Sequence, residues 1–206
     1  MALSSLALAL GLAVPLGLMA GLKPGSPTDL LAQSLAFTGQ IIPGFWLAMI
    51  LILTFAVQLR WLPSFGRDSL ASLVLPSLAL GFSSFGQLLR LTRASVLEVR
   101  GADFVRTAKA KGLVPWLVAL RHVLPNVLIP LVSIAGIQFT YLLGGSVYIE
   151  TIFAWPGLGS LLSSAIQDSD FPLVQAITIF ISLFAIGVQL LTDVAYALVD
   201  PRVQHG

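Results

Sequence analysis

The sequence contains no cysteine and very little charge. Without cysteine, the chain can form no disulfide, thiolate nucleophile or cysteine-based metal site. It has only two histidines, and it lacks the H-E-x-x-H and G-x-S-x-G motifs of metalloproteases and serine hydrolases. Charged residues make up 10% of the 206 residues, against about 25% in ordinary soluble proteins. A soluble domain needs more polar surface than this composition supplies.

Long uncharged runs occupy most of the chain. They cover residues 1–22, 30–59, 69–89, 122–149 and 171–192. Each run reaches the roughly 20 residues that a helix needs to cross a hydrocarbon core of about 30 Å. We therefore predict an all-α membrane protein, a single domain over 1–206 with about five transmembrane helices. The expected spans are about 3–21, 38–59, 70–91, 125–149 and 172–198.

The first run has a second interpretation, as a cleaved signal peptide. It lacks the positive n-region of such a peptide. Pro15 and the Gly17–Gly21 pair suit a membrane helix, where both residue types are frequent. We favour a retained span.

Seven of the eleven Lys and Arg residues form one basic island between the third and fourth spans. They are Arg90, Arg93, Arg100, Arg106, Lys109, Lys111 and Arg121. Basic residues concentrate in cytoplasmic loops. With the island in the cytoplasm, nine basic residues lie inside and only Arg60 and Arg67 lie outside. The N-terminus is then outside, the C-terminus is cytoplasmic, 92–124 is a cytoplasmic loop and 150–171 is an outer loop.

The basic island is expected to form a helix, a glycine turn and a second helix. Gly101 ends the helix that leaves the membrane, and Asp103 is a good N-cap for the next one. That helix runs to Lys111 and ends at Gly112, which can adopt the left-handed conformation of a C′ residue. Pro115 then suits the first turn of a following helix.

The short helix should present Phe104 and Ala108 on one face and Arg106 and Lys109 around the other. An amphipathic helix of this kind can dock in a groove on a partner protein. The same basic loop could instead hold anionic lipid headgroups, and the residues alone leave both interpretations open. A helix-turn-helix for nucleic acid is disfavoured because both ends of the loop continue directly into membrane spans.

The segment from Arg106 to Pro125 resembles the cytoplasmic loop of bacterial ABC importer permeases. The pattern of that loop is Glu-Ala-Ala, three residues, Gly, nine residues, Ile, one residue and Leu-Pro. Its positions are taken here by Arg106-Thr107-Ala108, Gly112, His122 and Leu124-Pro125. The departures at the triplet and at His122 are similar to the peptide/nickel subfamily, whose loop reads Asp-Tyr-Val-Arg-Thr-Ala-Lys-Ala-Lys-Gly-Leu. This chain has Phe104 at the second position and is otherwise the same from Asp103 to Leu113.

Further matches extend the resemblance over essentially the whole chain. They are Phe45-Trp46-Leu47, Trp61-Leu62-Pro63, Arg121-His122, the outer-loop run from Glu150 to Gly159, and Asp200-Pro201-Arg202. The chain is thereby identified as similar to the dipeptide/oligopeptide/nickel family, as its B-type inner-membrane component. The resemblance implies a type I ABC importer permease fold with a coupling-helix loop. Family members usually have six spans, so this chain is expected to lack the usual first one.

The resemblance implies a permease subunit of an ATP-driven importer in the bacterial inner membrane. The subunit would form half of the translocation path for peptides or nickel. It would not be an enzyme and would bind no cofactor, because the sequence has no G-x-x-x-x-G-K-[ST] phosphate loop and ATP would belong to separate ATPase subunits. Expected partners are a second homologous permease, two ATPases, an extracytoplasmic substrate-binding protein and membrane lipid, with no nucleic acid.

Three groups of site residues follow. The ATPase-coupling group is Asp103, Arg106, Thr107, Ala108, Lys109, Lys111, Gly112, Leu124 and Pro125. The outer-loop group, for contact with the binding protein or as an interfacial turn, is Glu150, Trp155, Pro156 and Gly157. The possible pore-lining group is Ser83, Ser84, Gln87, Gln138, Thr140 and Gln175. Hydrogen bonds between helices explain this last group at least as well.

The main alternative is a secondary transporter or channel subunit that is not driven by ATP. Ion coupling would need charges within the membrane, and only Asp193 qualifies. We expect Asp193 to pair with a basic residue of the loop. A purely structural membrane subunit is a further alternative.

Overall fold

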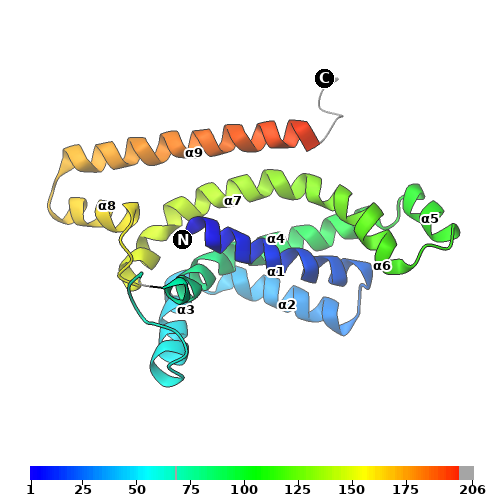
Figure 1. The fold of residues 1–206 in the computed structure, drawn as a ribbon, viewed down its shortest axis with the longest axis horizontal. Helices are drawn as coiled ribbons and strands as arrows, with labels where there is room; N and C mark the ends of the chain where they lie inside the picture. Colours follow the sequence, from blue (N-terminus) through cyan, green and yellow to red (C-terminus); the bar gives the residue numbers. More distant parts are fainter. Residues whose placement is uncertain (68, 200–206) are drawn as a thin grey trace.

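The computed structural model describes residues 1–67 and 69–199, so Asp68 and the predicted ending Asp200-Pro201-Arg202 lie outside the described residues. Every regular element in the two described ranges is a helix, as predicted. The long helices run side by side, and short helices stand at both ends of this bundle (Figure 1).

The described residues form nine α-helices. They are α1 (Ala2–Leu22), α2 (Pro27–Ile41), α3 (Gly44–Leu51), α4 (Val74–Val99), α5 (Asp103–Ala110), α6 (Pro115–Val118), α7 (Leu124–Ile152), α8 (Leu158–Gln167) and α9 (Phe171–Val199). A π-helical segment, Ile52–Gln58, extends α3, and another, Ala119–Val123, joins α6 to α7. A short 3-10 turn, Leu70–Leu73, precedes α4.

The described helices include four that are long and apolar enough to cross a membrane, and a bent pair brings the number to five. The predicted spans 3–21 and 172–198 closely follow α1 and α9. The predicted spans 70–91 and 125–149 are parts of longer helices, Leu70–Val99 and Pro115–Ile152. Neither helix is interrupted where its charge-free run meets the basic island, since Arg and Lys are good helix formers.

The predicted span over 38–59 is not one straight helix. Residues 38–41 belong to α2, and the helix that resumes at Gly44 is bent from α2 by 106°. Ile42 is extended because a following proline drives a residue out of the helical region. Pro43 then precedes the first turn of α3, so the chain turns sharply within an uncharged run.

Small residues let the helices approach α4 closely. A Cβ added to Gly17 or Gly21 of α1 would lie 2.6 Å from Thr92 or Val96 of α4. Gly86 of α4 similarly faces the Ala36 carbonyl of α2, at 2.6 Å from an added Cβ. Backbone approach through small residues is the usual packing of membrane helices. It makes α4 the central helix, in contact with α1, α2, α3 and α7.

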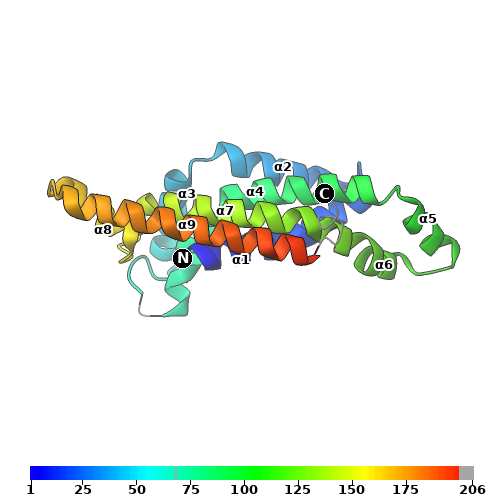
Figure 2. The ribbon, with the colours of Figure 1, turned by 90° about the horizontal axis from the view of Figure 1, so that it is seen from above.

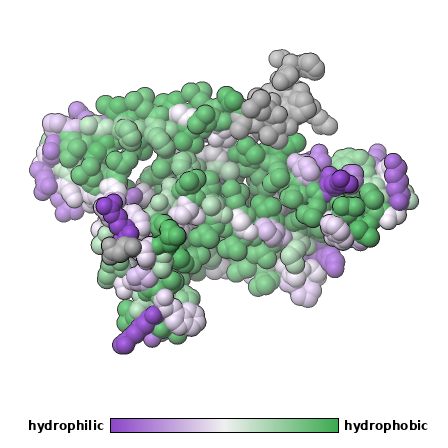
Figure 3. All heavy atoms as spheres, viewed as in Figure 1, coloured by the Kyte–Doolittle hydropathy of each residue, from purple (hydrophilic) through white to green (hydrophobic). Residues whose placement is uncertain are grey.

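The two ends of the bundle differ in composition from its middle. The α1–α2 connection, α5 and α6 lie at one end, and α3, α8 and the start of α1 lie at the other (Figures 1 and 2). Hydrophobic side chains cover the middle of the face shown in Figure 3, and hydrophilic ones gather at the ends. This belt is what a membrane-spanning bundle requires.

Candidate functional site

The predicted helix and glycine turn of the basic island are present as α5 and Gly112. Lys111 is the C-cap of α5, and Gly112 follows with φ +79°. The Gly112 amide donates to the Lys109 carbonyl at 3.0 Å, and the Leu113 amide donates to the Ala108 carbonyl at 3.4 Å. The left-handed conformation expected of Gly112 is therefore confirmed, and it turns the chain from α5 towards α6.

Asp103 does not act as the N-cap. The cap is Ala102, which is extended, and Asp103 is the first residue of α5. Its carboxylate lies 3.6 Å from the Arg106 guanidinium, and both side chains are exposed. Exposed ion pairs of this kind contribute little stability, so the local shape depends on Gly112 more than on Asp103.

The buried face of α5 consists of Val105 and Ala108, which pack into the apolar core of the bundle. The expected apolar face of Phe104 and Ala108 is therefore wrong in part, since Phe104 is 46% exposed. Ala108 faces the bundle and not the solvent. The rotation of α5 about its own axis turns Val105 and Ala108 towards the core and Phe104 away from it. The exposed residues of the predicted coupling group are Asp103, Arg106, Thr107, Lys109, Lys111, Gly112 and Pro125, and Leu124 is half-buried.

After Gly112, the chain continues through α6 into α7 without a break in the helix. Pro115 stands at the first turn of α6, and the helix then runs to Ile152. Its π-helical segment Ala119–Val123 ends just before Leu124 and Pro125. Pro125 has no amide to donate and its ring displaces the preceding turn, which explains a wide turn at this place. α5 is thus joined to the long helix through α6.

Two interactions that sequence reasoning missed hold the helices beneath α5. Arg93 donates from Nε to Asp29 Oδ1 and from Nη2 to Oδ2 at 3.0 Å, and Asp29 is only 1% exposed. Arg100 donates to the carbonyls of Gly21 and Leu22 at 3.4 Å, at the C-terminus of α1. Asp29 in the first turn of α2 was the sequence signal for such a pair, because a buried carboxylate needs a cationic partner.

The outer loop contains a buried carboxylate. Glu150 lies near the end of α7, is 7% exposed, and accepts a hydrogen bond from the Ser160 amide at 2.9 Å. It therefore sits at the N-terminus of α8, where a negative charge is favourable. An added Cβ on Gly157 or Gly159 would lie 2.5 Å or 2.9 Å from this carboxylate. Glu150 is thus largely enclosed by its own chain, and contact of the outer loop with a binding protein stays a prediction.

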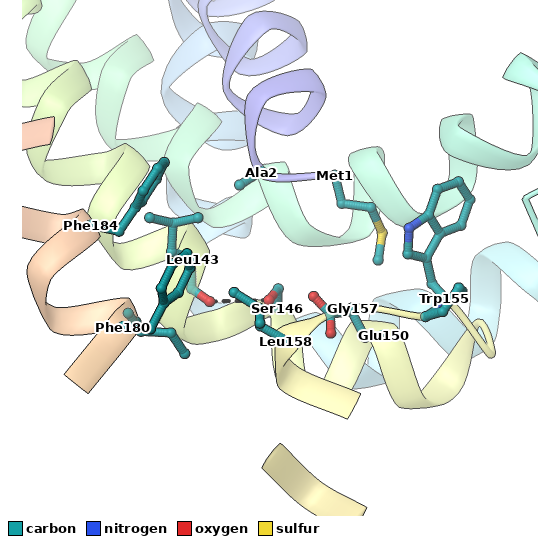
Figure 4. Close-up of a pocket in the computed structure, with 12 residues that line it drawn as sticks. Met1, Ala2, Leu143, Ser146, Glu150, Trp155, Gly157, Leu158, Phe180 and Phe184 are labelled. Atoms are coloured by element: carbon teal, nitrogen blue, oxygen red, sulfur yellow. Dashed lines mark hydrogen bonds between the residues drawn. The ribbon is translucent and has the colours of Figure 1, made fainter. Parts of the chain in front are cut away.

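Glu150 also faces a pocket of about 330 Å³ (Figure 4). Met1 and Trp155 lie on one side of it, and Phe180 and Phe184 of α9 lie on the other. Trp155 is half-buried, and Pro156 is exposed. The predicted turn at Trp155, Pro156 and Gly157 links α7 to α8 and closes the pocket.

Three of the possible pore-lining residues are hydrogen-bonded to one another. Ser84 donates to Gln138 Oε1 at 2.8 Å, and Gln138 Nε2 donates to Gln87 Oε1 at 2.6 Å. They connect α4 to α7, which favours the interpretation as helix–helix contacts. The remaining candidates do not join them: Thr140 donates to the Gly136 carbonyl within α7, Ser83 lines a separate groove, and Gln175 is exposed on α9.

Asp193 does not pair with the basic loop. Among the described residues its recorded partner is Gln189, one turn earlier in α9, which donates to the Asp193 carboxylate at 3.1 Å. α9 contacts α7 and α8, and the expected ion pair with the loop is wrong.

Comparison with known proteins gives three results. The model of the protein family described as "binding-protein-dependent transport system inner membrane component" matches residues 13–205. The glutathione transport system permease protein GsiC of Escherichia coli strain K12 is 41% identical over 189 residues, covering 92% of this chain and 62% of that protein. The protein of the same name from Pectobacterium atrosepticum is 40% identical over 201 residues, covering 98% and 66%. The chain thus spans less than two thirds of the length of these relatives.

A solved structure of the MetNI methionine ABC transporter, in an inward-facing conformation, has the same fold. It superimposes with a TM-score of 0.78 over 97% of this chain and 91% of that chain, at 18% sequence identity. The expected type I permease fold is therefore confirmed at the level of architecture.

Proposed function

The chain belongs to the family of binding-protein-dependent transport system inner membrane components, and on this premise we propose that it forms half of the membrane passage of an ATP-driven importer. A second, homologous permease supplies the other half. Two ATPase subunits supply the energy, and an extracytoplasmic binding protein delivers the cargo. The chain itself binds no nucleotide in this scheme.

The observation that carries this proposal is the geometry of the elbow formed by α5, Gly112 and α6. α5 has a basic exposed surface with Arg106, Lys109 and Lys111, while Val105 and Ala108 fix its other face to the bundle. A protein that docks on α5 and moves would therefore displace α6 and the long helix that follows. Such a rigid-body movement is how coupled subunits switch between two packed arrangements.

The roles within the coupling group follow from position. Arg106, Lys109 and Lys111 contact an acidic rim on the ATPase, with Thr107 beside them. Gly112 and the turn before Pro125 set the angle of the elbow, and Ala108 fixes it to the bundle. Specificity for an ATPase then depends on the exposed basic residues, and force transmission depends on the buried ones.

We further propose peptide-type cargo. The relatives named above are glutathione transport permeases, and glutathione is a short peptide. Nickel is the competing cargo. Uptake of labelled glutathione and of nickel, measured in cells with and without the chain, distinguishes the two, and the absence of both types of uptake contradicts the proposal.

The end of the bundle that carries α5 is proposed to face the cytoplasm. Lys23, Arg100 and the α5 residues lie at this end, whereas Arg60 and Arg67 belong to the connection at the opposite end. This distribution follows the positive-inside rule. On this basis we infer that the N-terminus of α1 lies outside and the end of α9 lies inside.

Cross-linking tests the proposal directly. A photo-reactive group at Ala110, which is exposed on α5, should capture an ATPase subunit in intact cells. The same group at Ser163 on α8, which is half-buried at the other end, should capture none. Capture of an ATPase only from Ser163, or labelling of α5 by a membrane-impermeant reagent from outside, would reverse the assignment.

A further inference from the structure

A pocket of about 290 Å³ lies between α2 and α4. It includes neither the elbow formed by α5, Gly112 and α6 nor the turn between α7 and α8. The two helices are neighbours in both views (Figures 1 and 2). The polar side chains that line the pocket are Gln33, Gln40, Arg90 and Arg93, and Ala36 and Phe37 supply part of its apolar wall. A polar pocket between two apolar helices needs an explanation, because side chains in such helices normally face lipid or pack.

One of the two arginines is already neutralised. The Arg93 guanidinium binds both carboxylate oxygens of Asp29, and Asp29 Oδ2 also accepts the Gly25 amide at 2.9 Å. This fork fixes the Arg93 side chain, of which 24% is exposed. Arg93 therefore forms a rigid wall of the pocket and brings it no unbalanced charge.

Arg90 is different. It lies one helical turn before Arg93, so both are on the same face of α4. Its side chain is exposed, and none of the acidic residues that the structure describes forms an ion pair with it. Arg90 thus leaves the pocket with one net positive charge beside apolar surface.

The amide side chains complete a set of donors. Gln33 and Gln40 are two turns apart on α2, on the side that faces Arg90. Gln40 Nε2 also donates to the Ala36 carbonyl at 3.1 Å, which holds it at the edge of the pocket. A guanidinium with neighbouring amide N–H groups matches the planar oxygens of a carboxylate or phosphate. The lining contains no carboxylate, and nearby Asp29 is already bound by Arg93, so the charge of the pocket disfavours a cation.

We propose that the α2–α4 pocket binds the phosphate of an anionic phospholipid headgroup, with Arg90 as the charged ligand. The acyl chain of that lipid lies against Ala36 and Phe37, and Phe37 is 68% exposed. A peptide in passage also offers a carboxylate to Arg90, but glutathione, the cargo proposed above, has no apolar chain to lie against Phe37. The lipid proposal does not rest on the proposed function, and binding of cargo is a contrary outcome of the test.

The test uses the assembled importer and four variants. Arg90→Gln removes the charge, Arg90→Lys keeps the charge without the planar fork, and Arg67→Gln removes an exposed arginine at the opposite end as the matched control. Gln33→Leu is a further variant that leaves every arginine in place. Elution of each complex in detergent checks that it assembles.

Lipid binding and cargo binding need separate measurements. Native mass spectrometry of complexes extracted from membranes that contain phosphatidylglycerol measures the anionic lipid that each complex retains. Uptake of labelled glutathione into vesicles made only of phosphatidylcholine measures cargo transport where no anionic lipid competes for Arg90.

The proposal expects Arg90→Gln to retain about tenfold less anionic lipid than the wild type, Arg90→Lys and Gln33→Leu to lose less, and Arg67→Gln to match the wild type. Wild-type lipid retention in Arg90→Gln, or an equal loss in Arg67→Gln, overturns the proposal. A loss of glutathione uptake with wild-type lipid retention assigns Arg90 to the cargo and also overturns it. If the wild-type complex takes up no glutathione, the proposed cargo is contradicted, and lipid retention still decides the pocket.

Discussion

The two ends of the molecule each carry a short helix joined to the same long helix, but they treat charge in opposite ways. At one end, α5 exposes Arg106, Lys109 and Lys111. At the other end, the Glu150 carboxylate is buried and accepts a hydrogen bond from the Ser160 amide in the first turn of α8. Both corners contain a residue with positive φ, Gly112 at +79° and Ala154 at +49°.

This difference indicates that the α5 end binds a partner and the α8 end stabilises the chain itself. Exposed charges contribute little to the stability of their own chain and are available to a partner. A buried carboxylate must find its partners inside the chain, and removing them is costly. We therefore expect changes at the α5 end to affect coupling, and changes at the α8 end to affect stability.

Substitution of Gly112 by valine should give the largest effect. A β-branched residue in the left-handed region is strained by about 1–2 kcal/mol, and relief of the strain would change the angle between α5 and α6. Uptake should fall to background while the chain still inserts and assembles. Gly101→Val is the matched control, since its backbone has negative φ and an added Cβ meets only the Glu98 carbonyl, at 3.9 Å. Unchanged uptake in Gly112→Val would refute the role of the elbow.

At the outer corner, Glu150→Leu should lower stability by about 1–3 kcal/mol, because the Ser160 amide loses its acceptor. Glu150→Gln keeps an oxygen at this place and should lose less. Asp168→Asn, an exposed change in the same loop, should match the wild type. Thermal unfolding in detergent and proteolysis at α8 report the difference. Equal melting of the Leu and Gln variants would show that the carboxylate does not hold this corner.

The middle of the bundle provides an intermediate case. Gln138→Leu removes hydrogen bonds to Ser84 and Gln87, and such bonds average about 0.6 kcal/mol each in membranes. Stability should fall by about 1 kcal/mol, with uptake within about twofold of the wild type. Gln175→Leu, on the exposed face of α9, is the control. A large loss of uptake at unchanged stability would identify Gln138 as part of the passage.

The smallest effect is expected for Lys109→Gln on α5. One exposed charge should change the affinity for the ATPase by about threefold or less, and more at low salt than at high salt. Lys23→Gln, exposed at the same end but off α5, tests whether general positive charge is sufficient. Binding measured by titration at two salt concentrations compares them. A salt-independent or equal effect in the two variants would mean that α5 is not the docking surface.

The elbow could be predicted from sequence because its signals are local. Gly112 and Pro115 have backbone preferences that do not depend on distant neighbours. The buried face of α5 could not be predicted in the same way. Phe104, Val105 and Ala108 are all apolar, and a helix of two turns gives no periodicity that selects among them. The position of the bundle decides that Val105 is enclosed and Phe104 is not.

Long-range partners account for the other differences. Asp29 and Arg93 are 64 residues apart, and Glu150 binds a backbone amide, which leaves no mark in the side-chain pattern. Glycines of one helix also differ. An added Cβ on Gly144 would meet nothing within 4 Å, whereas Gly136 closely approaches Thr192 of α9. Composition indicates that small residues pack, but the helix crossing decides which of them do.

The unbroken helix from Pro115 to Ile152 has a mechanical consequence. Its 38 residues give a length of roughly 57 Å at 1.5 Å per residue, whereas a bilayer with its headgroups is about 40–45 Å thick. The helix is therefore longer than the barrier that it crosses. Pivoting by about 5° around its midpoint would carry its two tips roughly 2.5 Å in opposite directions. A single tilt could then narrow one mouth of a channel while widening the other.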